Sequence, residues 1–309
     1  MMHIVVLGGA AGGGFPQWNC GCVNCIRARN GDPAAKPRTQ CSLAVSADGR
    51  NWLLLNASPD LREQIAANPV LHPNGSGRDS PIRAVLLTGA EIDAVAGLLH
   101  LRESQPLRVH ASARALSLIA ANPMFRALDP TFVAKSEIPL AEAETIRDFK
   151  GEPTGLTVEA YAVPGKVALY AEAEEAPEFG SAPGDTLGVA VRDAANGACF
   201  HFVPACAGLS PDLTARLSGA SLVFFDGTLW TDDEMIRLGL GRKTGRRMGH
   251  LSVSGEDGAV AGLARLGIRR KVFVHVNNTN PILIADSPER QIIEQAGWEV
   301  AEDGMEIAL

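Results

Sequence analysis

The chain has 309 residues, of which 46% are hydrophobic and 20% are charged, a balance typical of a soluble globular protein. Asp and Glu number 35 against 28 Lys and Arg, so the formal net charge of -7 argues against a general nucleic-acid binder, which needs a basic surface. The apolar run Ile4–Leu7 is too short for a signal peptide and no run approaches the ~20 residues that span a bilayer, so we expect a cytoplasmic protein with no membrane partner.

Short apolar runs alternate with helical patterns along the whole chain. In chain order, strands are predicted at His3–Leu7, Ser42–Ser46, Trp52–Leu55, Ala84–Thr88, Arg108–His110, Leu156–Val163, Leu187–Val191, Ala198–Val203, Leu222–Asp226 and Lys271–His275. Helices are predicted at Asp60–Ala67, Ile92–Arg102, Ala113–Ala120, Pro211–Leu217, Val253–Leu266 and Pro288–Ala296. The Ala/Glu-rich segment Ala171–Ala176 is interpreted as an exposed excursion. This alternation suits either one α/β sandwich or a doubly wound sheet, so local motifs must decide.

A glycine-rich loop, Gly8–Gly14, follows the first predicted strand. No frame within it supplies the three glycines of a dinucleotide-binding fingerprint, and Phe15-Pro16 cannot open a helix cleanly. A phosphate-binding P-loop is excluded too, because Lys243-Thr244 lacks the preceding glycine. The loop therefore predicts neither kind of nucleotide site.

Three cysteines lie within six residues, at Cys20, Cys22 and Cys25. Three thiolates at this spacing can surround one tetrahedral cation, which predicts a structural zinc site. The alternatives are a redox pair formed by Cys22 and Cys25, which prefers a helix N-terminus after a strand, and three free thiols. The candidates for a fourth zinc ligand are Cys41, His275 and Asn278.

Acidic and imidazole side chains follow several of the apolar strands. Glu91 and Asp93 come after the strand that ends at Thr88, where they serve either as helix-capping acids or as part of a site. Asp226 ends one apolar strand, and His275 ends another. Together with His250, in a glycine-flanked loop, they form the set from which a metal or catalytic site is built.

Long motifs now resemble the coenzyme PQQ biosynthesis protein B family. The matching stretches are Val5–Gly8, Gly12–Cys20, Leu54–Asp60, Val163–Val167, Phe225–Thr228, Lys243–Gly245, Met248–His250 and His275–Pro281. This resemblance implies an α/β (α+β) fold, the metallo-β-lactamase-like αββα sandwich, as a single domain over residues 1–309. It places a zinc-binding loop at about residues 8–41.

The resemblance also assigns residues to the metal positions of the superfamily. The slots of the first metal hold Gly89, Glu91 and Lys166, which are not three imidazoles, so this first site is expected to be absent and Lys166 to supply positive charge instead. The slots of the second metal hold Asp93, Ala94, Asp226 and His275. The family typically has His at the position of Ala94, so this chain departs from the pattern there.

The activity that the resemblance implies is a step in PQQ formation from a small peptide-derived precursor with a Glu–Tyr cross-link. The expected reaction is an Fe(II)- and oxygen-dependent hydroxylation of the tyrosine ring. Asp93, Asp226 and His275 would hold the iron, while His250, Lys166 and Glu91 would act as catalytic residues. The basic residues Arg242, Lys243 and Arg246 would bind the precursor's carboxylates, unless they form an ordinary solvated loop.

Two other functions remain open at this point. A carrier for PQQ or its precursor is favoured by Ala94, which removes a metal-binding imidazole. A metal-dependent hydrolase is disfavoured because the first metal's histidines are absent. Either a monomer or a homodimer is compatible with the sequence.

Overall fold

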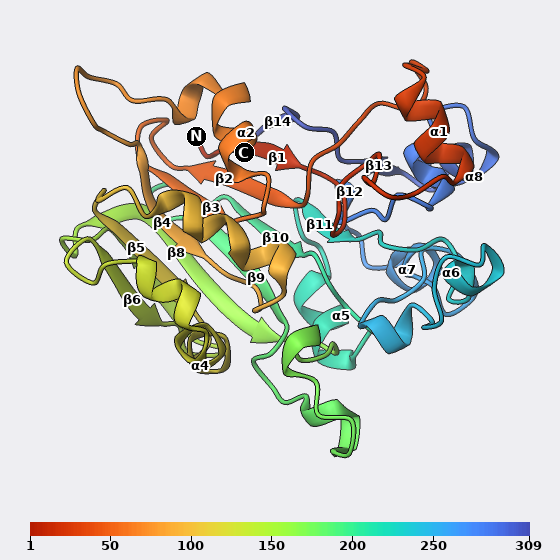
Figure 1. Cartoon of the computed structure of the whole chain (residues 1–309). Coiled ribbons are helices and arrows are strands. Elements are labelled where there is room, and N and C mark those ends of the chain that lie inside the picture. Colours follow the sequence, from red (N-terminus) through yellow and green to blue (C-terminus); the bar gives the residue numbers. More distant parts are fainter.

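The computed structural model describes all 309 residues except the side chains of Pro177 and Phe179. Two seven-stranded sheets pack face to face, and helices cover their outer faces (Figure 1). This is the αββα sandwich that the resemblance implied. Among the described residues, no helix has the length and apolarity needed to cross a membrane.

The first sheet has the strand order β14-β1-β2-β3-β4-β5-β6. Its strands are β1 (His3–Gly8), β2 (Ser42–Ser46), β3 (Trp52–Leu55), β4 (Ile82–Leu86), β5 (Leu107–Ala111), β6 (Val133–Glu137) and β14 (Glu306–Ala308). The second sheet has the order β13-β12-β11-β10-β9-β8-β7. Its strands are β7 (Ala143–Arg147), β8 (Pro153–Ala162), β9 (Leu187–Asp193), β10 (Cys199–Val203), β11 (Val223–Asp226), β12 (Lys271–Val274) and β13 (Trp298–Val300).

The central strands, such as β2, β3 and β11, are apolar on both faces because both of their faces are buried. Successive strand residues point to opposite sides of a sheet. Ile4 therefore packs between the two sheets, while its neighbour Val5 packs under the outer helices. Phe224 and Phe225 divide in the same way between the inner core and the helix layer. This explains why the sequence shows continuous apolar runs and not strict alternation.

The helices are short and lie in the connections. They are α1 (Val23–Arg29), α2 (Leu61–Ala67), α3 (Ile92–Val95), α4 (Ala113–Ala121), α5 (Pro211–Leu217), α6 (Glu234–Arg237), α7 (Ala259–Leu263) and α8 (Pro288–Gln295). Short 3-10 helices lie at Pro69–Leu71, Ala96–Leu101, Pro123–Ala127, Leu169–Ala171, Pro177–Gly180, Arg246–Met248 and Pro281–Leu283. Ser112 and Ser287 cap α4 and α8 as their sequence positions predict.

The predicted helix Val253–Leu266 was too long, because only α7 forms there. Gly255 has a φ of 93°, a left-handed conformation that a continuous helix cannot contain. The predicted helix Ile92–Arg102 instead splits into α3 and the 3-10 helix Ala96–Leu101. Helix α1 was missed altogether, because its short sequence carries no clear apolar period.

Parallel pairing brings the chemically active segments to one edge of the sandwich. Strands β3 to β6 run parallel in the first sheet, and β10 to β13 run parallel in the second. The carboxyl ends of parallel strands meet at the same edge of a sheet, where α/β folds place their sites. The segments that follow β4, β11 and β12 therefore lie where the two sheets can share one cavity.

Candidate metal centre

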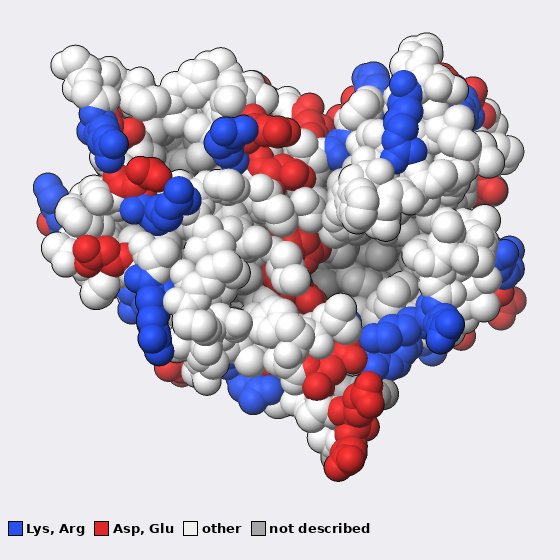
Figure 2. Space-filling view, viewed as in Figure 1, with Lys and Arg blue, Asp and Glu red and all other residues white. Residues whose placement is uncertain are grey.

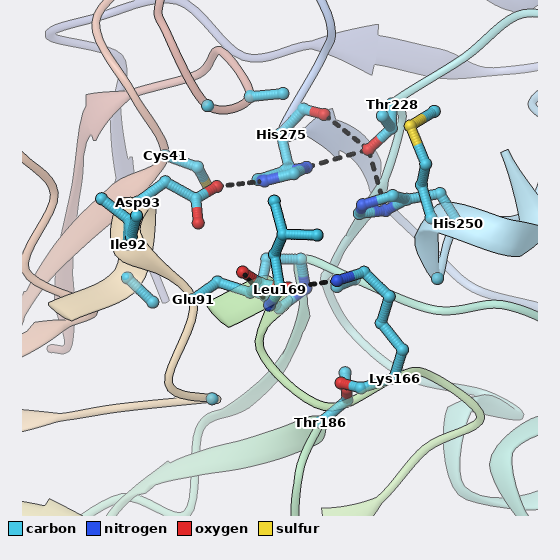
Figure 3. Close-up of a pocket in the computed structure, with 18 of the residues that line it drawn as sticks. Cys41, Glu91, Ile92, Asp93, Lys166, Leu169, Thr186, Thr228, His250 and His275 are labelled. Atoms are coloured by element: carbon cyan, nitrogen blue, oxygen red, sulfur yellow. Dashed lines mark hydrogen bonds and ion pairs between the residues drawn. The ribbon is translucent and has the colours of Figure 1, made fainter. Parts of the chain in front are cut away.

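A cavity of about 610 Å³ opens at this edge and is lined by both halves of the sandwich (Figure 3). The first half supplies Glu91, Asp93 and Ala94, and the second supplies Lys166, His250 and His275. Most of the residues that the sequence assigns to the active site therefore line this one cavity, and the exceptions are given below.

Asp226, His250 and His275 form the tightest group of potential ligands. One ligand atom from each lies within 4.8 Å of the others, and the two imidazole rings stack with centroids 5.0 Å apart. The hydroxyl of Thr228 lies among them, 2.6 Å from Asp226 Oδ1, 3.0 Å from His250 Nδ1 and 2.8 Å from His275 Nδ1. Sequence reasoning had not included Thr228 in the site, although it directly follows the Asp226-Gly pair.

Backbone groups fix the carboxylate of Asp226, whose exposure is 0%. It accepts hydrogen bonds from the amides of Cys206 (2.9 Å) and Thr228 (3.0 Å), and its Oδ2 lies 2.8 Å from His250 Nδ1. A carboxylate so placed can hold an imidazole or a cation without moving.

Asp93 joins this group through His275. Its Oδ2 lies 2.7 Å from His275 Nε2, and its side chain is 18% exposed. Burial alone would raise the pKa of Asp93, but the hydrogen bond and charge of His275 outweigh it and hold that pKa low. Burial likewise opposes protonation of His275, yet Asp93 raises its pKa. The two side chains therefore form an ion pair that orients the imidazole.

The backbone of His275 is strained. Its φ is 55°, in the left-handed region that residues other than glycine rarely adopt. Such strain persists only where the surroundings enforce it, and it gathers at functional sites. Here it turns the chain at the end of β12, and the imidazole lines the cavity.

The donor types and distances fit a divalent transition metal. Two imidazoles and one carboxylate are the set that non-haem Fe(II) oxygenases use, with the remaining positions open. Sequence reasoning grouped Asp93, Asp226 and His275 as ligands and gave His250 an acid/base role. The structure places His250 with Asp226 and His275, whereas Asp93 contacts His275 from outside the group.

Lys166 and Glu91, which stand in two slots of the superfamily's first metal, bind each other. Lys166 Nζ lies 2.6 Å from Glu91 Oε1 and 3.3 Å from a carboxylate oxygen of Glu172 (Figure 3 shows the first contact). Glu91 also accepts a hydrogen bond from the amide of Leu169 at 3.2 Å. An ammonium group thus neutralises the carboxylate where a cation would otherwise be held. Ala94 lines the cavity with 7% exposure and offers no ligand atom.

The three basic residues expected to bind substrate do not stay together. Lys243 lines the main cavity. Arg246 is exposed and lines a separate shallow pocket near Asp232, while Arg242 is exposed and lines neither. Arg247, which sequence reasoning left out, instead reaches Glu172 at 2.8 Å.

The three N-terminal cysteines form a second cluster, with ligand sulfurs within 4.8 Å of one another. The side-chain amide of Asn278 faces them, with its nitrogen 3.3 Å from Cys25 Sγ and 3.7 Å from Cys22 Sγ. A 180° flip of this amide, which is hard to tell from the assigned orientation, presents the oxygen to the same point. Of the three candidates for a fourth ligand, Asn278 is the one in contact.

The other two candidates lie at the main cavity. Cys41 is buried, lines that cavity and has a pKa raised by burial and by the charge of Asp93. His275 belongs to the group around Asp226. The contact at Asn278 is secured by Asn24, whose amide nitrogen donates to the carbonyls of residues 278, 279 and 280.

The thiols of this cluster are electronically unequal. Burial would raise the pKa of Cys20, but hydrogen bonds from the amide and thiol of Cys22 outweigh it and lower that pKa. Burial and the neighbouring sulfurs raise the pKa of Cys22 to about 12. Cys22 also caps the N-terminus of α1, the helix end that a redox pair prefers, but a long loop and not a strand leads into it.

Comparison with known proteins gives consistent matches. The family model described as the beta-lactamase superfamily domain matches residues 51–276. Coenzyme PQQ synthesis protein B of Gluconacetobacter diazotrophicus is 54% identical over 307 residues, covering 99% of each chain. The protein of the same name from Bradyrhizobium diazoefficiens is 50% identical over 311 residues, covering 100% of each.

Solved structures agree with this. The Zn(2+)-bound PqqB of Methylobacterium extorquens superposes with a TM-score of 0.93 at 48% identity, covering 99% of this chain and 100% of that one. A diphosphatase from the PhnP family gives a TM-score of 0.69 at 18% identity, covering 99% and 96%, which shows a shared fold.

Proposed function

This chain belongs to the coenzyme PQQ synthesis protein B family of the beta-lactamase superfamily, and we propose that it hydroxylates the tyrosine-derived ring of a Glu–Tyr cross-linked precursor. The reaction would use Fe(II), O₂ and a two-electron reductant, so that one oxygen atom enters the ring and the other leaves as water. The observation that carries this proposal is the convergence of Asp226, His250 and His275 within 4.8 Å, with both imidazoles lining a cavity of about 610 Å³. The donor set suits iron, and the cavity is of a size that suits a small ligand.

Asp226, His250 and His275 would hold the iron, which would supply the activation of oxygen toward an aromatic ring. The protein's own residues prepare the site. Asp93 accepts the Nε2 proton of His275, which fixes the tautomer and leaves Nδ1 toward the cation position. The amides of Cys206 and Thr228 hold the Asp226 carboxylate in place.

The rest of the cavity wall suits a precursor that carries carboxylates. Lys243 offers a positive charge at the cavity wall, and the ion pair with Glu91 holds the Lys166 side chain in place. Lys166 Nζ lies 2.6 Å from Glu91 Oε1, so this pair fixes the ammonium group at the wall of the cavity, where both residues are candidates for catalytic roles. Gly249, which precedes His250, packs closely against Lys166: a Cβ atom at Gly249 would lie 3.1 Å from Lys166 Cγ.

We further propose that Cys20, Cys22, Cys25 and Asn278 hold a structural zinc ion. Three converging sulfurs and one amide provide four ligands, as closed zinc sites require. The ion would tie the loop at residues 8–41 to the segment after β12, since Asn278 follows that strand. The Zn(2+)-bound relative supports a zinc ion in this family.

A carrier of PQQ or its precursor is the second candidate function. Ala94 favours it, because a side chain without ligand atoms lines the cavity next to Asp93. A hydrolase that uses two metals is disfavoured by the Lys166–Glu91 ion pair.

The test is single-turnover oxidation. Protein loaded with Fe(II) under nitrogen is mixed with the cross-linked Glu–Tyr compound and a two-electron reductant, and then with O₂. The mass of the product is measured by mass spectrometry. The proposal expects gain of oxygen by the ring, and loss of that gain in His250→Ala. Tight binding of the compound without any gain of oxygen would contradict the hydroxylase proposal and favour the carrier function.

A further inference from the structure

Glu172 is the meeting point of three basic side chains at the margin of the main cavity. Arg247 contacts its carboxylate at 2.8 and 3.3 Å, Lys166 Nζ lies at 3.3 Å and Lys243 Nζ at 3.5 Å. The Glu172 side chain is 8% exposed. The segment Ala171–Ala176, which the sequence predicts to be an exposed excursion, therefore buries the carboxylate of Glu172 among three basic side chains.

The four residues come from two segments that are far apart in sequence. Lys166 and Glu172 lie between β8 and β9, in the green segment that projects at the bottom of Figure 1. Lys243 and Arg247 lie between α6 and β12. In Figure 2 the acidic groups of this projection lie directly beside a basic cluster. Glu172 is thus a link between two segments at the cavity.

Three basic side chains contact the single carboxylate of Glu172. Hydrogen bonding from Arg247, with the charges of Lys166 and Lys243, outweighs burial and lowers the pKa of Glu172 to about 2. Lys166 also pairs with Glu91, whereas Lys243 pairs with Glu172 and its side chain is 40% exposed. Paired cations of this kind are what recognise carboxylates in proteins.

Two of the three cations also face the ligand space. Lys166 and Lys243 line the cavity, whereas Glu172 does not. A carboxylate that enters the cavity can therefore reach the same ammonium groups from the opposite side. Glu172 holds them in the position that a ligand carboxylate would need.

We propose that Lys166, Lys243 and Arg247 form the carboxylate-recognition site for the substrate, and that Glu172 occupies this site until a ligand carboxylate displaces it. The ligand class is a small aromatic compound with two or more carboxylates. This inference rests on the proposed function, because it supplies that function with its substrate contacts. It keeps Lys243 and adds Lys166, which lines the cavity, and Arg247, which does not line it but binds Glu172 at 2.8 Å. Arg242 and Arg246 are left out, because they are exposed and do not line the cavity.

Displacement has a structural consequence. Glu172 ties its segment to the Lys243 and Arg247 segment, and Leu169 and Tyr170 tie it to the cavity wall through Glu91 and the carbonyl of Ala90. A ligand carboxylate that binds the basic side chains would break the contacts of Glu172 with Lys243 and Arg247. It would leave the contacts of Leu169 and Tyr170 intact. The internal carboxylate thus competes with ligand and sets a threshold for binding.

The test uses PQQ, a tricarboxylate, as the probe with full-length protein, and measures its dissociation constant by titration calorimetry. Glu172→Gln removes the internal competitor, and we expect PQQ to bind roughly tenfold more tightly, the effect of one charge-assisted hydrogen bond. Glu175→Gln is the matched control, because it makes the same charge change in the same segment, at a residue that is exposed. Lys243→Gln with Arg247→Gln should weaken binding by at least about tenfold.

A second probe separates recognition from a general change of charge. The trimethyl ester of PQQ has the same rings without carboxylates, so Glu172→Gln should leave its affinity unchanged. The proposal is overturned if Glu172→Gln fails to tighten PQQ binding, if Glu175→Gln tightens it equally, or if the cation variants bind PQQ like wild type. These titrations need neither iron nor oxygen, so a negative result would leave the hydroxylase proposal standing. If the titrations succeed and turnover is not observed, the carboxylate-recognition site stands and the hydroxylase proposal falls.

Discussion

Lys166 Nζ lies 2.6 Å from Glu91 Oε1, and both side chains line the main cavity. An ammonium and a carboxylate at this distance satisfy each other, so the chain keeps a charged wall without an ion there. Within this cavity Asp226, His250 and His275 are the group of donors that could hold a metal ion. The proposed function places one metal ion there, and a single ion suits oxidation better than two-metal hydrolysis.

The ion pair should contribute measurably to stability. Lys166→Met removes a cation that is 17% exposed and leaves Glu91 and Glu172 with fewer partners. We expect the free energy of unfolding to fall by about 1–3 kcal/mol. The measurement is urea denaturation of Lys166→Met, Glu91→Gln and the double variant. A strictly additive double variant would show that the two side chains are not coupled.

Asp93→Asn should weaken iron binding without touching zinc. The carboxylate orients His275 from 2.7 Å, and amide replacement removes the charge that favours its bound tautomer. Loss of such a supporting carboxylate lowers metal affinity about 10–100-fold. Metal content measured after Fe(II) competition with a chelator gives the shift, and the zinc content of the same samples is the control. Equal iron affinity would show that Asp93 does not position His275.

Disrupting the cysteine cluster should remove the structural zinc ion and destabilise the loop at residues 8–41. Cys25→Ser, at a position with 0% exposure, is expected to lose zinc and to lower the melting temperature. Cys199→Ser, a half-buried thiol far from the cluster in sequence, is the matched control and should retain zinc. Zinc content by mass spectrometry and thermal melts decide the point. Zinc retained in Cys25→Ser would contradict the assignment.

Buried histidines should make the fold sensitive to acid. Burial lowers the pKa of His110 to about 4 and that of His201 to about 4, whose Nδ1 lies 2.9 Å from the Tyr161 hydroxyl. Because the folded pKa is below the ordinary 6.5, the contribution is present above pH 6.5 and is lost as the pH falls towards 4.

His110→Gln provides the measurement for this pH dependence. Its free energy of unfolding, from urea curves between pH 7.5 and 4.5, is expected to fall less steeply than that of wild type. The difference removes the contribution of carboxylates, which titrate equally in both proteins. Parallel curves would contradict the burial of a neutral imidazole at residue 110.

The strands and the fold were predictable because buried sheets need long apolar runs, and the motifs near Cys20 and His275 identify the family. The local chemistry was less accessible. Helix α1 is too short for a visible period, and the strained turn at His275 depends on the fold around it. Glu172 was the sharpest miss, since its partners Lys243 and Arg247 lie in another segment and only the fold brings them together.

The measurement that tests the central claim most directly is the metal content of protein purified without oxygen and supplied with iron. Wild type is compared with His275→Ala and Ala94→His, which leave the cysteine cluster intact. We expect one zinc in all three, and iron in wild type that His275→Ala loses. Wild type with zinc alone, and iron gained only by Ala94→His, would contradict the iron site and favour the carrier.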